Sequence, residues 1–163
     1  QSLICHYLGE HGLGVPVGVL KEKIDFINSH DAVLAVEIHF NSAVKWVDKD
    51  GDGVYDEGED EHVGRGCETL YYPNSEKGKL AAQVVQDRLA LVYPPDRGVK
   101  EGWYKMNPKN GADMFLRRTN CTSLIIEPEF IHRKELIQEY REVACKEITH
   151  ALRVVNDLLI KKG

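Results

Sequence analysis

The stretch Leu34-Ala35-Val36-Glu37-Ile38-His39-Phe40-Asn41 decides the fold. Its nearly continuous apolar run is typical of a strand that is buried on both faces of a parallel sheet. A second apolar run, Ser123-Leu124-Ile125-Ile126-Glu127, ends in a carboxylate. Ligands bind beyond the carboxyl ends of the strands in open α/β sheets. We therefore expect His39 and Glu127 to lie at the same end of one sheet, in one hydrolytic zinc site.

The segments around these two runs alternate between helical and extended patterns. Amphipathic helices are expected over residues 20–27, 75–92 and 136–159, and a further strand over residues 67–72. Ser75 is the expected N-cap of the second helix, which should turn Leu80, Val84, Val85 and Leu89 toward the core. Residues 96–122 show no clear period and are expected to be irregular, apart from short extended pieces near Val99 and Tyr104. This order indicates an α/β fold with a twisted, mostly parallel sheet and helices on both faces.

Composition narrows the class of protein. The chain has 163 residues, enough for one domain with a substantial core, and 42% hydrophobic and 29% charged residues are typical of a soluble globular protein. A net charge of -5 argues against a nucleic-acid-binding protein, which needs a basic face. No apolar run approaches the ~20 residues that a membrane-spanning helix needs. We expect the protein to be a monomer. The four cysteines form no CxxC pair, and residues 1–6 show no signal-peptide pattern.

The acidic segment 48–59 matches a calcium-binding loop. Its sequence fits the pattern D-x-D-x-D-G-x5-E at every position. The pattern predicts oxygen ligands from Asp48, Asp50, Asp52, the Val54 carbonyl, Asp56 and Glu59. Because no amphipathic helices flank the loop, structural bracing is a better interpretation than calcium sensing. The alternative is a solvated acidic loop that happens to contain glycines.

Other interpretations remain open for the residues at the strand ends. His39 alone could be a hydrogen-bonded structural ring, and Glu37, on the same side of the strand, is a rival partner for it. Glu127 should meet a cation, a donor or a metal-activated water, because ionised carboxylates are almost never buried unpaired. Basic and aromatic residues are scattered over residues 97–118: Arg97, Trp103, Tyr104, Lys105, Arg117 and Arg118. Such side chains suit the binding of a ligand with sugar or carboxylate groups. The alternative is a solvated loop with no binding role.

Five segments, taken in order, carry a resemblance to a known family. They are Val36–Ala43, Gly66–Tyr72, Ser75–Leu91, Asp96–Lys100 and Leu124–Phe130. They resemble the "I-H-x-N", "G-x-E-x-x-Y-Y", helical, "R-G-x-K" and "L-x-E-x-x-F" segments of zinc-dependent N-acetylmuramoyl-L-alanine amidases of phage endolysins and bacterial autolysins. The ordered set covers nearly the whole chain from about residue 20 onward.

The resemblance implies a peptidoglycan hydrolase. His39 matches the last of three zinc ligands, and Glu127 matches the glutamate that acts as general base on a zinc-activated water. The bond cleaved would join N-acetylmuramic acid to L-alanine of the stem peptide. Asn41 and Arg97, which lie in matched segments, are expected to bind the substrate. Zn²⁺ is then the catalytic cofactor and Ca²⁺ the structural one.

The sequence departs from the family at its start. The family's first histidine follows a first strand and its glutamate ligand lies early in the first helix. The resemblance implies that this chain begins inside that helix. His6, Glu10 and His11 are poor substitutes, because the resemblance puts them at the wrong end of the helix. Residues 1–163 are thus expected to form one amidase-like domain, with an insertion over about 44–65.

Two alternatives to the amidase remain at this point. One is a non-catalytic, calcium-stabilised module that binds the cell wall, and the other is a zinc peptidase that acts on the stem peptide. Each of the three would act on the cell wall, outside the cell or as a released phage lysin.

Overall fold

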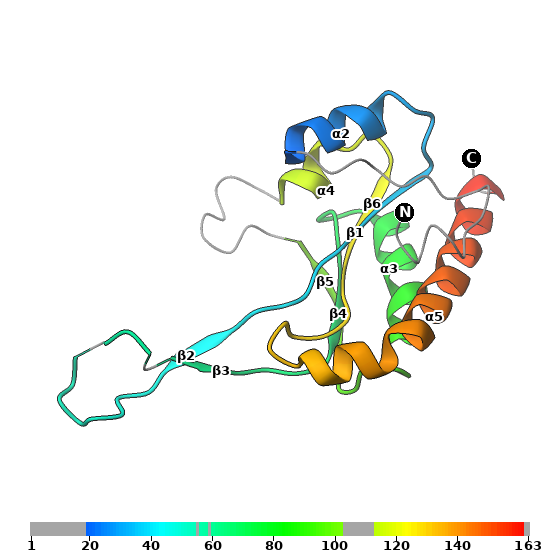
Figure 1. Ribbon diagram of the computed structural model, residues 1–163. Coiled ribbons are helices and arrows are strands. Elements are labelled where there is room, and N and C mark those ends of the chain that lie inside the picture. Colours follow the sequence, from blue (N-terminus) through cyan, green and yellow to red (C-terminus); the bar gives the residue numbers. More distant parts are fainter. Residues whose placement is uncertain (1–18, 55, 59, 103–112, 162–163) are drawn as a thin grey trace.

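The computed structural model describes residues 19–54, 56–58, 60–102 and 113–161. A four-stranded sheet forms the centre of the fold, in the order β1-β6-β4-β5, and a separate hairpin is made by β2 and β3 (Figure 1). The strands are β1 (Leu34–Ile38), β2 (Val44–Trp46), β3 (Asp60–His62), β4 (Cys67–Tyr71), β5 (Asp96–Glu101) and β6 (Thr122–Glu127). The helices are α2 (Leu20–Asn28), α3 (Glu76–Leu89), α4 (Met114–Arg118) and α5 (Lys134–Lys161).

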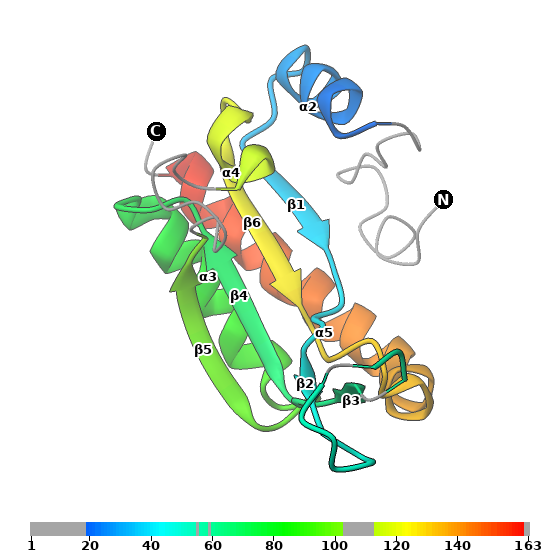
Figure 2. The same ribbon diagram turned by 90° about the vertical axis from the view of Figure 1, so that its left-hand side faces the viewer.

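The sheet is mixed but mostly parallel, as expected. β1 pairs with β6 in parallel and β4 pairs with β5 in parallel, whereas β4 and β6 are antiparallel. The carboxyl ends of β1 and β6 therefore meet the amino ends of β4 and β5 at one end of the sheet, the lower end in Figure 2. We call this the site end, because His39, Glu68, Arg97 and Glu127 lie there.

Helices cover both faces of the sheet, which confirms the predicted layers. α3 and α5 pack on one face, over a core that includes Leu124 and Ile126 of β6. α2 and α4 pack on the other face, over a smaller core that includes Ile125. Successive residues of a strand point to opposite faces. Glu127 therefore shares the α2/α4 face with Ile125.

Helix α3 begins and runs as predicted, but one of its core positions was wrong. Ser75 is the N-cap, and its hydroxyl accepts a hydrogen bond from the Gly78 N–H at 3.0 Å. Leu80 was expected in the core, yet it is 42% exposed. Val85 and Leu89 are buried as expected, and the rest of the buried stripe is made of small or polar residues: Gly78, Ala81, Ala82 and Gln86. The close approach of α3 to the sheet favours these small side chains over a leucine.

The segment 96–122 is more regular than the sequence predicts. It contains the six-residue strand β5 and the short helix α4. Asp113 caps α4, because its carboxylate accepts a hydrogen bond from the Phe115 N–H at 2.8 Å. Phe115 and Leu116 then fill the smaller core. A helix of five residues is too short to show a period in the sequence.

The segment expected as an insertion forms an antiparallel hairpin. β2 and β3 pair from Val44–His62 to Trp46–Asp60, and all residues of both strands are exposed. The hairpin projects from the site end, away from the sheet (Figure 1). None of the described helices, including the 28-residue α5, is long and apolar enough to cross a membrane.

Candidate active site at one end of the sheet

The structure brings His39 and Glu127 to the same end of the sheet, as expected. The parallel pairing sets Ile38 opposite Ile126, so that His39 and Glu127 are the next residues of the two strands. The His39 N–H donates to the Ile126 carbonyl at 2.9 Å, which continues the pairing by one step. Each of the two residues is thus the polar side chain at the carboxyl end of its apolar strand.

His39 contacts the carboxylate that the sequence marked as its rival partner. Its Nε2 lies 3.3 Å from the Glu37 Oε2, and about half of the imidazole is exposed. The hydrogen bond to Glu37 raises the pKa of His39 against the opposing effect of burial, and the charges of Glu127 and Asp113 add to the rise. With Nε2 in contact with Glu37, Nδ1 is the other ring nitrogen that could bind a metal ion.

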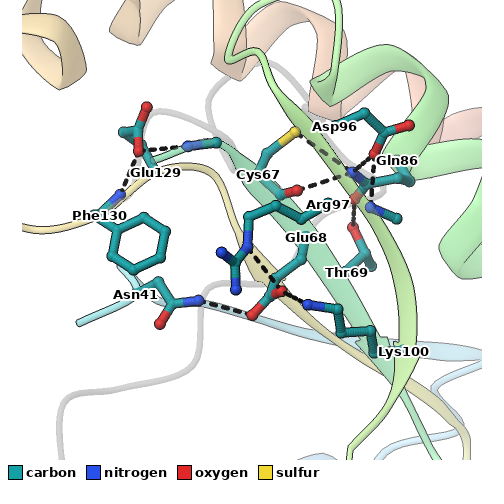
Figure 3. Close-up of polar contacts among 12 residues, drawn as sticks. Asn41, Cys67, Glu68, Thr69, Gln86, Asp96, Arg97, Lys100, Glu129 and Phe130 are labelled. Atoms are coloured by element: carbon teal, nitrogen blue, oxygen red, sulfur yellow. Dashed lines mark hydrogen bonds and ion pairs between the residues drawn. The ribbon is translucent and has the colours of Figure 1, made fainter. Parts of the chain in front are cut away.

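A buried carboxylate that the sequence did not single out lies beside Glu127. Glu68 is directly opposite Glu127 in the antiparallel pairing of β4 with β6, and it is only 2% exposed. Its Oε1 accepts a hydrogen bond from Asn41 Nδ2 at 2.7 Å. Its Oε2 accepts from Arg97 Nε at 3.0 Å and from Lys100 Nζ (Figure 3).

The surroundings of Glu68 keep it ionised. Burial alone would raise its pKa, but the hydrogen bonds from Lys100, Glu127 and Arg97 outweigh this effect and hold the pKa of Glu68 well below its usual value. The two residues predicted to bind substrate, Asn41 and Arg97, are thus both bound to this carboxylate. Arg97 also lies over the Phe130 ring, 5.0 Å from its centroid.

Glu129 is a second buried carboxylate, and it braces the site end. It is fully buried, and its Oε1 accepts hydrogen bonds from the N–H groups of Gly66 and Phe130, both at 2.8 Å (Figure 3). Its Oε2 lies 3.5 Å from Arg133 Nε, with no hydrogen bond among the described residues. The segment after β6 also pairs with Asn41, through a parallel bridge to Phe130. Glu129 therefore fixes the start of β4 to the end of β6.

The side chains at the site end include the kinds of ligand atom that zinc binds. An imidazole bound to a carboxylate is a common unit of zinc sites, and His39 with Glu37 is such a unit. Within the described residues, however, the only three side chains with metal-ligand atoms that converge are Asp48, Asp50 and Asp52. His6, Glu10 and His11 lie outside the described residues.

The loop between β2 and β3 gathers the acidic residues of the calcium pattern. The ligand atoms of Asp48, Asp50 and Asp52 lie within 4.8 Å of one another. The Asp48 carboxylate accepts hydrogen bonds from the Gly51 and Gly53 N–H groups, at 2.6 and 3.0 Å. Gly53, at the sixth position of the pattern, has a φ of +76°, which glycine adopts without strain. Val54 and Asp56 follow in the exposed part of the loop, and Glu59 lies outside the described residues.

The scattered basic and aromatic residues do not assemble into one surface. Arg97 is at the site end, whereas Arg117 lines a hollow beside Tyr72 and Thr122, at the opposite end of the sheet. Trp103, Tyr104 and Lys105 lie outside the described residues. The interpretation of these residues as one binding surface is therefore wrong for Arg97 and Arg117.

Solved structures with similar folds include N-acetylmuramoyl-L-alanine amidases and the catalytic domain of an endolysin. An N-acetylmuramoyl-L-alanine amidase from Clostridium difficile 630 is 23% identical, with a TM-score of 0.61, over 85% of this chain and 65% of that one. The catalytic domain of CwlV from Bacillus (Paenibacillus) polymyxa var. colistinus is 18% identical, with a TM-score of 0.62, over 87% and 68%. The catalytic domain of the CD27L endolysin, which targets Clostridia difficile, is 24% identical, with a TM-score of 0.56, over 80% and 59%. At such identities the likeness shows the fold.

The chain spans less than two thirds of the length of the Clostridium difficile amidase and of the endolysin domain. No curated protein sequence matches it. The model of one protein family, described as N-acetylmuramoyl-L-alanine amidase, matches residues 14–152. This match includes β1, β6 and the whole site end between them. The chain belongs to the N-acetylmuramoyl-L-alanine amidase family.

Proposed function

We propose that this chain hydrolyses bacterial peptidoglycan at the amide between the lactyl group of N-acetylmuramic acid and L-alanine of the stem peptide. The observation that carries the proposal is the family match over residues 14–152, which includes the site end where His39 and Glu127 meet. Hydrolysis of an amide needs a base for the attacking water and an acid for the leaving amine. A carboxylate at the end of a buried strand can serve as both in turn.

Glu127 is the proposed general base. It takes a proton from the attacking water and passes it to the nitrogen of the leaving alanine. His39 would hold a zinc ion, oriented by Glu37 through the 3.3 Å contact. Zinc supplies Lewis acidity, which polarises the scissile carbonyl and activates water. The described residues provide one histidine for this ion, so metal analysis is part of the test.

The test compares the wild-type chain with Glu127→Gln on purified murein, with zinc content measured on both. New alanine amino termini and intact glycan strands are expected from the wild type, and Glu127→Gln should lose the rate by roughly 10²-fold or more while keeping its zinc. Glu139→Gln, on the exposed face of α5, is the matched control and should keep full rate. Full rate in Glu127→Gln would refute the role of Glu127. Cleavage within the stem peptide would indicate a peptidase, and binding without release would indicate a wall-binding module.

We also propose that the loop over residues 48–59 binds Ca²⁺. The convergence of Asp48, Asp50 and Asp52 supports this, because hard oxygen ligands at this spacing suit calcium. The Val54 carbonyl, Asp56 and Glu59 complete the proposed ligand set. Titration calorimetry with calcium at millimolar concentration checks it, with Asp50→Asn as the control that should bind far more weakly. Absence of calcium heat in the wild type would remove the proposal.

The proposed partner is the peptidoglycan of the cell wall, where the enzyme acts as a monomer. Every residue of β2 and β3 is exposed beside the site end, which leaves the hairpin open to contact the wall. Light scattering of the purified chain checks the monomer. A concentration-independent dimer mass would contradict it.

A further inference from the structure

We propose that Glu68 is a positioning residue for Glu127, which lies directly opposite it in the β4–β6 pair, on the face of the sheet that also carries His39. This inference rests on the proposed role of Glu127 as the general base. It adds a second carboxylate to the reaction, one that stays ionised and never receives the proton itself.

The pairing of β4 with β6 puts the two carboxylates side by side. Glu68 and Glu127 are direct partners in an antiparallel pair. Side chains at such positions point to the same face, with their Cβ atoms about 4.5–5.5 Å apart. Like charges directly opposite are destabilising unless other groups compensate. The chain keeps this pair on the two central strands, at the site end, and the groups around it explain how.

Three donors from two parts of the fold fix the Glu68 carboxylate. Asn41 follows β1, and Arg97 and Lys100 lie on β5 (Figure 3). Arg97 is itself held against the Phe130 ring. With both oxygens engaged and a side-chain exposure of 3%, the carboxylate has one orientation. The charges of Arg97 and Lys100 balance those of the two glutamates.

An ionised Glu68 can accept a hydrogen bond but cannot donate one, so Glu127 can donate to it only while Glu127 carries a proton. Protonated Glu127 is the state that follows proton transfer from water and precedes transfer to the leaving amine. Glu68 therefore stabilises the form of Glu127 that the reaction must pass through. The proton moves from water to Glu127 and then to nitrogen, and Glu68 ends each cycle unchanged.

A purely structural role for Glu68 is the competing explanation. In that case it would serve only to neutralise Arg97 and Lys100 inside the protein. Such a role predicts loss of stability on substitution, and a rate that falls only as the folded fraction falls. A positioning role predicts in addition a shifted pH dependence, because the charge next to the general base has changed.

The experiment measures kcat and KM against pH on a soluble muramoyl peptide, for the wild type, Glu68→Gln, Glu68→Asp and Lys100→Met. Zinc content and thermal unfolding are measured on each variant. Glu68→Gln should lower kcat by roughly 10- to 100-fold, change KM less than about threefold, and move the acidic limb of the profile to lower pH. Lys100→Met, which removes a positive charge beside Glu68, should move that limb to higher pH. Glu68→Asp keeps the charge and should keep the wild-type limb, with a partial rate.

The outcomes separate this inference from the proposed function. If Glu127→Gln is inactive but Glu68→Gln keeps its kcat or loses it with no shift of the limb, the positioning role is wrong and the general base stands. If Glu127→Gln keeps its full rate, the proposed function fails and this inference fails with it. If Glu68→Gln does not fold, the pH profile of Lys100→Met tests the positioning role in its place. An acidic limb at the wild-type pH, or at a lower pH, would overturn the proposal.

Discussion

Glu129 offers a direct test of how the site end is held together. Its buried carboxylate accepts hydrogen bonds from the Gly66 and Phe130 N–H groups, and Arg133 lies 3.5 Å away. Glu129→Ala leaves two buried N–H donors without their acceptor. Hydrogen bonds to charged groups contribute about 1.5–3 kcal/mol each, so the two bonds represent about 3–6 kcal/mol.

Part of this loss is offset, because alanine removes a carboxylate whose burial costs free energy. We therefore expect Glu129→Ala to lower the free energy of unfolding by about 3 kcal/mol, near the low end of the range for breaking a buried ion pair. For a protein of this size, that corresponds to a decrease in Tm of about 6–12 °C. Glu129→Gln keeps an oxygen in place for both N–H groups and should lose about 1 kcal/mol.

The assay is urea unfolding followed by circular dichroism, with metal-ion concentrations held constant because bound ions shift the equilibrium. Glu139→Ala, on the exposed face of α5, is the control and should change stability by less than about 0.5 kcal/mol. A loss below about 1 kcal/mol in Glu129→Ala would refute the reasoning. It would mean that the N–H groups of Gly66 and Phe130 find water or another acceptor.

Three further predictions follow from the charges of the described residues. Calcium at ~10 mM should stabilise the wild type by about 1–3 kcal/mol in thermal unfolding if the loop binds with the ~10⁻⁴–10⁻³ M affinity of extracellular modules, and Asp50→Asn should show no such gain. The lowered pKa of Glu68 contributes stability that is present above the usual carboxyl value of 4.5 and is lost as pH falls through the folded-state pKa. Urea unfolding below about pH 4.5 should therefore show a steeper loss for the wild type than for Glu68→Gln, and parallel curves would contradict this. Burial, with a smaller contribution from Asp96, raises the pKa of Cys67 to about 11, so at pH 8 its thiol should resist iodoacetamide in the folded protein and react in denaturant, as mass spectrometry would show.

The sequence was enough to predict which two strands carry His39 and Glu127 to the site end. The runs that became β1 and β6 are mostly apolar and end in His39 and Glu127, so their length and their polar ends predicted the shared end of the sheet. The N-cap of α3 was equally readable, because serine before an amphipathic segment has a local physical meaning. Both predictions depend on neighbours within a few residues.

The groups around Glu68 could not be predicted in this way. Its hydrogen-bond partners Asn41 and Arg97 are 27 and 29 residues away, and the Gly66 N–H that Glu129 binds is 63 residues from it. Only the order of the strands brings these residues together. The error at Leu80 has a similar cause, since periodicity identifies an apolar stripe but not how closely a helix approaches the sheet.

The reversed direction of β4 and β5 relative to β1 and β6 has a consequence for how this enzyme can change. Three connections cross the site end: the one that runs from β1 to β4, the one that enters β5 and the one that leaves β6. Each can lengthen without altering a single pair of the sheet, and the projecting hairpin occupies one of them. New contacts to the proposed peptidoglycan substrate can therefore be added around an unchanged site end, one connection at a time.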